Sequence, residues 1–259
     1  MKILTPEYLK KIIPSAFAER AHSRVSTKYV FVPTSKITQD LAGVGWFPVE
    51  AYQSKSSVYA GFQKHMIKFA NPEYSSDLDV IPNLILINGH NALTACKIFI
   101  GYHIRSCMNG LVTGDVLDRI IGVHLEYSVK MLYDLMGRFF ERIENSLSII
   151  NKSKVIEMKQ IEINKFVMQA AEIRFNKDMI KAKRINMDSV QFVRRPEDDN
   201  TTLWSVYNRI QENIIKGGIE IITNNGRDIY TQNTKPITEI NKQIMINVAL
   251  WNLMKTYIK

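Results

Sequence analysis

The sequence predicts an α+β fold in which a mixed or antiparallel sheet with interposed helices precedes a mainly helical part. Short apolar runs bounded by Pro, Gly, Asn or Ser fill the first half of the chain, as in strands. Apolar residues spaced three and four positions apart fill the second half, as on one face of a helix. At 259 residues, with 46% hydrophobic content, the chain is long enough to bury a sizeable core.

The first domain is expected to span residues 1–128. It should begin with a helix, because Thr5-Pro6-Glu7 is typical of a helix start with proline in the first turn. A second, short helix is expected from Ser35 to Ala42, which Ser35 caps. The expected strands are Tyr29–Pro33, Phe47–Gln53, His65–Phe69, Leu84–Ile87 and Ala95–Ile100.

The second domain is expected to span residues 129–259 and to be mainly helical. Amphipathic spacing predicts one helix from Val129 to Ile150 and another from about Ser153 to Phe175. A third helix should begin at Thr201 or Thr202 and stop at the paired glycines Gly217-Gly218. The remaining expected features are a basic connector over residues 174–200, a glycine-hinged loop over 217–237 with a hairpin turn at Asn225-Gly226, and a final helix from about Thr238 to Tyr257. We place Trp204, Tyr207 and Trp251 in the core of these helices.

Positive charge is the clearest indication of a partner. Lys and Arg number 34 against 25 Asp and Glu, which gives a net charge of +9 and a pI near 9.4. Such an excess of positive charge creates an electrostatic field that attracts polyanions, and nucleic acid is an abundant polyanion in every cell. Many soluble proteins are basic without binding nucleic acid, so charge by itself leaves both interpretations open.

Specific residues indicate where nucleic acid would bind. Phosphate binding needs surface Lys and Arg, and sequence-tolerant binding of single strands adds aromatic faces such as Tyr230. An alternative interpretation is that the same cations are solvated helix ends and loop residues. Arg209, Asn213 and Lys216 share one helix face, which is either a binding face or a polar packing network. The predicted nucleic-acid-binding residues are Lys181, Lys183, Arg184, Arg194, Arg195, Arg209, Lys216, Arg227 and Lys235.

Catalytic and metal chemistry find little support. All five histidines lie in the first half, but no pair has the spacing of metal ligands, so we interpret them as structural and expect no metal or cofactor. Cys96 and Cys107 lack a CxxC partner and suit reduced, partly buried thiols better than a disulfide framework or a zinc site. A Cys107 nucleophile with His90 or His103 as its base is the enzymatic alternative, whereas the absence of any complete catalytic motif favours a non-enzymatic function.

Eight stretches, taken in order, resemble one family along almost the whole chain. They are Pro14–Ala18, Tyr29 with Pro33-Thr34, Gly45–Pro48, Lys64–Met66, Pro82–His90, Cys107–Val112, Tyr207–Gly218 and Ala249–Trp251. In this order they resemble the phage- and plasmid-like proteins, also found in prophages, that are grouped as domain of unknown function 932. The resemblance implies a context of mobile genetic elements, and it implies no reaction.

We therefore hypothesise a nucleic-acid-binding protein of a phage or other mobile element. Its most concrete form is a single-stranded DNA binding or annealing factor of recombination that acts as a homo-oligomer. The alternative is a counter-defence protein of the anti-restriction type, which binds and inhibits a host defence protein. We expect no membrane segment and no signal peptide, and therefore a location in the cytoplasm of a bacterial host.

Overall fold

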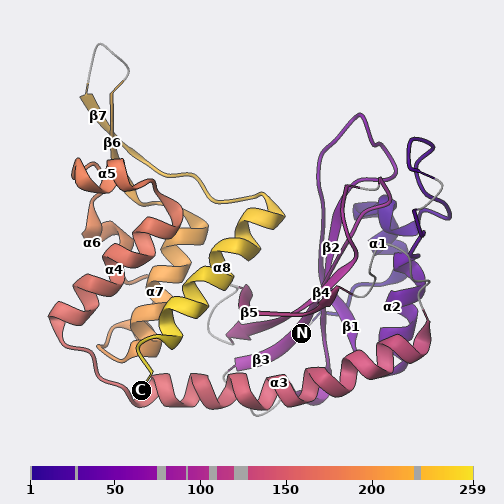
Figure 1. The fold of residues 1–259 in the computed structure, drawn as a ribbon, viewed down its shortest axis with the longest axis horizontal. Coiled ribbons are helices and arrows are strands. Elements are labelled where there is room, and N and C mark those ends of the chain that lie inside the picture. Colours follow the sequence, from indigo (N-terminus) through magenta and orange to yellow (C-terminus); the bar gives the residue numbers. More distant parts are fainter. Residues whose placement is uncertain are drawn as a thin grey trace. The chain divides into compact units, whose positions relative to one another are not determined.

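The computed structural model describes residues 2–26, 29–74, 80–91, 93–104, 110–119, 128–224 and 229–258 (Figure 1). The chain forms two compact units, Met1–Glu144 and Asn145–Lys259, which we call unit 1 and unit 2. The division falls inside one long helix, α3 (Val129–Val155). The expected domain boundary at residue 128 lies just before this helix, whereas the first part of α3 belongs to unit 1.

Unit 1 is built on a five-stranded antiparallel sheet in which neighbours in sequence are neighbours in space. Its order is β1-β2-β3-β4-β5. The strands are β1 (Phe47–Gln53), β2 (His65–Ala70), β3 (Val80–Asn88), β4 (Lys97–Ile104) and β5 (Gly110–Arg119). Such a meander, followed by helices, confirms the predicted α+β class.

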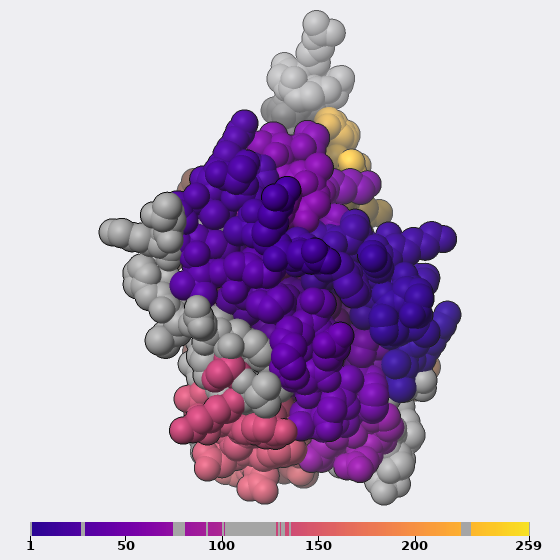
Figure 2. Space-filling model, turned by 90° about the vertical axis from the view of Figure 1, so that its right-hand side faces the viewer, coloured from indigo at the N-terminus to yellow at the C-terminus, as the bar shows by residue number. Residues whose placement is uncertain are grey.

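Helices flank this sheet in the sequence. They are α1 (Pro6–Ile12), α2 (Thr34–Gly43) and the first part of α3, with 3₁₀ turns at Pro14–Phe17 and Pro72–Tyr74. Thr5 caps α1 by accepting a hydrogen bond from the backbone N–H of Tyr8 at 3.3 Å. Trp46 is fully buried, and its ring meets that of Phe139 on α3 edge to face at 4.9 Å between centroids. Figure 2 shows residues of unit 1, coloured indigo to purple, packed side by side on one face.

Unit 2 is a helical unit that carries one hairpin. Its helices are α4 (Gln160–Arg174), α5 (Lys177–Lys181), α6 (Met187–Val190), α7 (Leu203–Lys216) and α8 (Ile240–Lys255), and a 3₁₀ turn spans Pro196–Asp198. The hairpin consists of β6 (Glu220–Asn224) and β7 (Ile229–Asn233), and Figure 1 shows it extending away from the helices of the same unit. Trp204, Tyr207 and Trp251 are buried in the core, as predicted.

Three local predictions differ from the structure. Ser35 does not cap α2, because the helix begins one residue earlier, at Thr34, and its N-cap residue is Pro33. Tyr29–Pro33 is not a strand, because its backbone groups have other partners: Tyr29 N–H donates to the carbonyl of Ser26, and the carbonyl of Val32 accepts from Asn88 Nδ2 at 3.0 Å. The helix predicted from about Ser153 is interrupted, since α3 continues to Val155 and α4 starts only at Gln160. Strand β5 was not predicted, and neither were the short helices α5 and α6 within the basic connector. The hairpin turn at residues 225 and 226 lies outside the described residues.

None of the helices within the described residues has the length and apolar character needed to span a membrane.

Candidate functional site

Helix α7 is set by strong local signals at both ends. Thr202 caps its start by accepting a hydrogen bond from the backbone N–H of Ser205 at 3.3 Å. Gly217 and Gly218 end it with φ angles of 80° and 81°, a conformation that favours glycine. A Cβ atom at Gly217 would overlap the carbonyl oxygen of Thr234. The predicted cap and stop are both confirmed.

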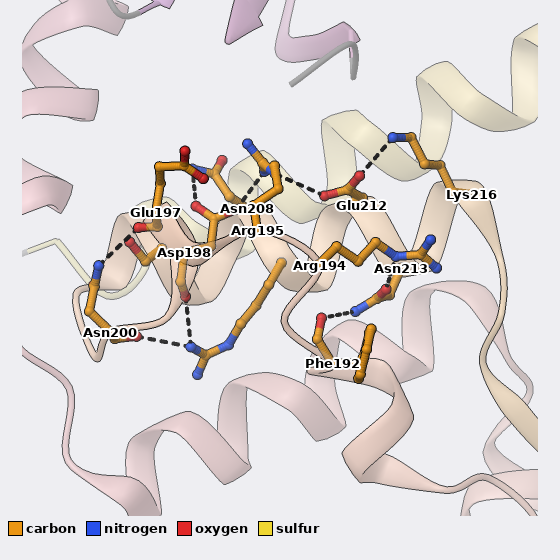
Figure 3. A network of polar contacts seen from close by, with 12 residues as sticks. Phe192, Arg194, Arg195, Glu197, Asp198, Asn200, Asn208, Glu212, Asn213 and Lys216 are labelled. Atoms are coloured by element: carbon orange, nitrogen blue, oxygen red, sulfur yellow. Dashed lines mark hydrogen bonds and ion pairs between the residues drawn. The ribbon is translucent and has the colours of Figure 1, made fainter. Parts of the chain in front are cut away.

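The polar side chains of α7 join the connector that precedes the helix. Asp198 and Glu212 are only 4% and 3% exposed, yet each lies next to a cation. Arg195 bridges them, with Nη2 2.5 Å from Asp198 Oδ2 and Nε 3.2 Å from Glu212 Oε2. Lys216 Nζ lies 2.6 Å from Glu212 Oε1. We call the whole group, most of which is labelled in Figure 3, the α7 polar cluster: Arg194, Arg195, Asp198, Asn208, Arg209, Glu212, Asn213 and Lys216.

The electrostatics of this cluster follow from burial and pairing. Burial raises the pKa of the Asp198 carboxyl, against the opposing effect of Arg195. Burial also acts to raise the pKa of Glu212, but Lys216, Arg195 and Arg194 outweigh it and lower that pKa below its ordinary value. Glu212 is therefore a stable anion inside the protein, and its neighbours are needed to keep it there.

Arg194 and Asn213 fasten the connector to the end of α7. Arg194 donates to Asn213 Oδ1 at 2.6 Å and to the carbonyl of Gly217 at 2.7 Å. The amide of Asn213 in turn donates to the carbonyls of Val190 and Phe192, at 3.1 and 2.8 Å. These contacts satisfy backbone carbonyls that α6 and α7 leave unpaired at their ends.

Arg209 is buried in the same cluster. Its Nη1 donates to the carbonyls of Asp198 and Asn200, at 3.1 and 2.9 Å. Burial lowers the pKa of its guanidinium, and the nearby carboxylates Asp198 and Asp199 oppose that effect. The shared face of Arg209, Asn213 and Lys216 therefore takes part in polar packing within unit 2.

The nine cations predicted to bind nucleic acid fall into three groups. Arg194, Arg195, Arg209 and Lys216 make the intramolecular contacts of the α7 polar cluster, and Arg184 Nε donates to the carbonyl of Ile222 at 2.9 Å. The side chains of Lys181, Lys183 and Lys235 are exposed and make no ion pair within the described part of the chain. Arg227 lies outside the described residues.

An open groove of about 470 Å³ lies at the base of the hairpin. Its cationic residues are Arg174, Lys235 and Lys242. Arg174 is fixed in place, because its guanidinium donates to the carbonyls of Ile214 and Lys235, the latter at 2.8 Å. Burial lowers the pKa of Arg174. The remaining lining residues are Ile221, Gln232, Asn233, Thr234, Pro236, Ile237, Thr238 and Glu239.

The strand register extends the groove onto one face of the hairpin. Ile221 pairs with Gln232, and both line the groove. Thr223 pairs with Tyr230 two residues further along, so Tyr230 lies on the same face as the groove. Tyr230 is 45% exposed. The groove therefore offers cations, amides and, next to them, one accessible aromatic ring.

Unit 1 contains a second buried polar group, which we call the histidine cluster: Ser15, Thr34, Gln53, His65, Asn88 and His90. His65 is at its centre, with Nδ1 2.9 Å from Ser15 Oγ and 3.0 Å from the carbonyl of Gln63. Its Nε2 lies 2.8 Å from Thr34 Oγ1, which also accepts a hydrogen bond from Asn88 Nδ2 at 2.9 Å. His90 Nε2 lies 3.4 Å from the same hydroxyl.

The hydrogen-bond partners determine where the protons of this cluster lie. The carbonyl of Gln63 can only accept, so Nδ1 of His65 carries the proton. Ser15 Oγ donates to Gln53 Oε1 at 2.6 Å and therefore accepts from His65. Because His65 donates to Ser15, it cannot act as the base that would activate this serine. The pair Ser15–His65 is a structural contact.

Burial keeps these histidines and the thiol of Cys96 uncharged. It lowers the pKa of His65 to about 3, with a further contribution from His90, and the pKa of His90 to about 4. Cys96 is a buried free thiol, as predicted, and burial raises its pKa to about 12. Cys107, the nucleophile of the enzymatic alternative, lies outside the described residues. Within the part of the chain that the structure describes, no group of three or more potential metal ligands comes together.

Sequence reasoning identified several members of the two clusters without revealing that they meet. Ser15, Thr34, His65, Asn88 and His90 come from four of the stretches that resemble the family, and the fold brings them together. Two further stretches meet in unit 2, where the rings of Tyr207 and Trp251 pack at 6.3 Å between centroids. The groove was missed, because it is formed by α4, the hairpin and the start of α8, which are distant in sequence.

The fold and its two buried clusters define an α+β protein whose family features lie in both units. A family model described as Domain of unknown function (DUF932) matches residues 21–251, and the chain therefore belongs to that family. It is 27% identical to UPF0380 protein YfjQ of Escherichia coli (strain K12) over 259 residues, which cover 98% of this chain and 91% of the relative. It is also 27% identical to UPF0380 protein YafZ of the same strain over 256 residues, which cover 96% of this chain and 89% of the relative. No solved structure matches the chain.

Proposed function

We propose that this protein binds single-stranded nucleic acid through the groove and the hairpin of unit 2. The observation that carries the proposal is the contrast among the cations. Those of the α7 polar cluster are held by carboxylates and carbonyls, whereas Lys181, Lys183, Lys235 and Lys242 are exposed and, among the described residues, have no ion-pair partner. Exposed lysines of this kind are available for phosphates.

The distribution of charge supports the same surface. Unit 2 contains 18 Lys and Arg against 12 Asp and Glu, a net charge of +6, and unit 1 contains 16 against 13, a net charge of +3. Two of the acidic residues of unit 2, Asp198 and Glu212, are buried and form ion pairs with Arg195 of the same unit. Most of the excess positive charge therefore belongs to unit 2, and the exposed lysines near the hairpin contribute to it.

The arrangement suits a single strand better than a duplex. Lys235 and Lys242 can meet phosphates in the groove, while Tyr230 offers a ring on which an unpaired base can stack. Base faces are hidden inside a duplex, so the contribution of Tyr230 is expected only for single strands. Every base has such a face, and we therefore expect binding with little dependence on sequence.

The test is fluorescence anisotropy of the full chain with labelled single- and double-stranded DNA and RNA of equal length, over a salt series. The proposal predicts a preference for single strands and a steep fall of affinity with salt. The variant Lys235→Gln/Lys242→Gln should weaken binding severalfold and reduce the salt slope by about 1 for each phosphate that the variant no longer binds. Tyr230→Ala should weaken single-strand binding about fivefold or more, at about 1–3 kcal/mol per stacked base.

The matched control is Lys165→Gln/Lys255→Gln, which removes the same charge from unit 2. Lys165 lies about 13 Å back along α4 from Arg174, and Lys255 about 20 Å along α8 from Lys242. The control should bind almost as well as the unchanged protein. If both double variants weaken binding equally, attraction is due to overall charge and the proposed groove is wrong. Equal affinity of the unchanged protein for single strands and duplexes would also contradict the proposal.

A further inference from the structure

Strand β7 has one paired edge and one open edge. Its partner β6 is covered on the far side by the connector, because Ile222 N–H donates to the carbonyl of Arg184 at 2.8 Å. The backbone N–H of Asn186 also donates to the carbonyl of Glu220 at 3.0 Å, and Ile185 forms a bridge to Ile221. β6 is therefore an inner strand, and β7 is the outer edge of the hairpin.

The register tells which groups point outward. Glu220 and Ile222 direct their backbone groups to the connector, so Ile221 directs its own to Gln232 on β7. By alternation, Thr231 and Asn233 direct their N–H and C=O groups to the open side. Within the described residues, no backbone hydrogen bond reaches these outward groups. The open edge thus presents ready donors and acceptors to a further strand.

This edge lacks the charged residues and the proline that often prevent strand pairing. All five residues of β7 are exposed, and the segment Ile229-Tyr-Thr-Gln-Asn233 contains neither a charged residue nor proline. Ile229 is 74% exposed. Soluble proteins commonly protect such edges with lysine, proline or a bulge, and β7 contains none of these among its described residues.

We propose that β7 pairs antiparallel with β7 of a second copy of this chain, about a two-fold axis at Thr231. In this register Thr231 of one copy faces Thr231 of the other. Tyr230 of each copy faces Gln232 of the other, and Ile229 of each copy faces Asn233 of the other. Each chain carries a net charge of +9, so two copies repel each other over most of their surface. Because the five residues of β7 are uncharged, two copies of the strand can approach in this register without like charges meeting between them, which favours a second copy as the partner.

The pairing would join two hairpins into one sheet. Residues that face each other across a ladder lie on the same face, so Tyr230 of both copies and both grooves would share one side of the joined sheet. Edge pairing alone buries less than the ~1,200 Å² of a standard stable interface, and we therefore expect a reversible, concentration-dependent dimer. The proposal does not depend on nucleic-acid binding.

A charge-pair experiment tests this register. Thr231→Lys and Thr231→Glu each place like charges opposite one another in the dimer, and each variant alone should sediment as a monomer at concentrations where the unchanged protein dimerises. An equimolar mixture of the two variants should recover the dimer, because lysine then faces glutamate. Thr231→Val is the control and should dimerise like the unchanged protein.

Recovery in the mixture shows that both variants are folded, since a misfolded chain would not be rescued by its partner. The proposal is overturned if the unchanged protein is monomeric throughout a wide concentration series. It is equally overturned if either charged variant alone still dimerises, or if the mixture stays monomeric. Analytical ultracentrifugation without nucleic acid measures all of these outcomes.

Discussion

The two units bury polar side chains in opposite ways. The histidine cluster of unit 1 is neutral and is held by hydrogen bonds among His65, Thr34 and Ser15. The α7 polar cluster of unit 2 is charged and is held by Arg195 between two buried carboxylates. Neutral groups tolerate burial as long as the solvent does not protonate them, whereas buried charges require each partner to remain in place. Unit 1 should therefore be sensitive to acid, and unit 2 to the loss of a single side chain.

Acidification should produce the largest difference between the units. The pKa values of His65 and His90 are lowered from about 6.5 to about 3 and 4. Below pH 6.5 the unfolded chain takes up protons that the folded chain does not, so stability present above pH 6.5 is lost as the pH falls toward 4 and then 3. The slope rises from about half of 1.4 kcal/mol per pH unit and histidine at pH 6.5 to the full value at lower pH, so unit 1 should lose roughly 3 kcal/mol between pH 6.5 and pH 5.

Hydrogen exchange followed by mass spectrometry of peptides from each unit can measure this loss. In unit 2 the pKa of Glu212 is lowered from its ordinary value of 4.5, so its charge stabilises the folded state at every pH above 4.5. This stabilisation should therefore remain at pH 5, where unit 1 has already lost stability. The variant His90→Gln removes one titrating group and should reduce the acid sensitivity of unit 1 by about half. Equal protection of unit 1 at pH 7 and pH 5 would contradict the neutral histidine cluster.

Among single substitutions, Arg195→Met should destabilise the protein most. It removes the ion pair of the buried carboxylate of Asp198 and one of the two ion pairs that Glu212 makes among the described residues. We expect a loss of about 3 kcal/mol in the free energy of unfolding, in line with other broken buried pairs. Urea denaturation of the variant and the unchanged protein measures the difference.

Lys216→Met is the matched comparison, because it removes the second ion pair of Glu212. Lys216 is 42% exposed in its side chain, and an exposed partner contributes little. We expect it to cost less than about 1 kcal/mol. If both substitutions had the same effect, burial would not be what makes Arg195 important.

Thr34→Val should have a smaller effect, confined to unit 1. Valine fills a similar volume but leaves His65 Nε2 and Asn88 Nδ2 without the hydroxyl that both contact. We expect a loss of about 2 kcal/mol, typical of buried groups left without a partner. Thr38→Val on the same helix is the control, since among the described residues the Thr38 hydroxyl donates to the carbonyl of Thr34 within α2 and to no side chain of the histidine cluster. A loss no greater than the control's would show that the hydroxyl of Thr34 does not support the cluster.

Much of the fold could be predicted from local patterns. The paired glycines, the Thr202 cap and the apolar repeats locate α7 and most of α3, because these signals act within a few residues. The break between α3 and α4 could not be predicted, since the N–H groups of Met158 and Leu203 pair with the carbonyls of Thr201 and Ile156. Such pairing spans more than forty positions of sequence and overrides local helical spacing.

The sites were predicted less well, for a related physical reason. A cation near other cations in sequence indicates a basic surface, but Arg195 and Arg209 meet their partners only when the connector folds back on α7. Lys181, Lys183 and Lys235 are exposed, as a binding role requires. Tyr230 and Lys235 could be named from composition, whereas the groove beside them depends on the strand register.

The burial of Cys96 gives unit 1 a built-in reporter of opening. A thiol with a pKa of about 12 and 5% exposure cannot react with a bulky labelling reagent while the unit is closed. The chain has two cysteines, so Cys107→Ser would leave Cys96 as its single thiol. Its labelling rate would then measure how often unit 1 opens. Unit 2 would give no signal in this assay, because both cysteines of the chain lie in unit 1.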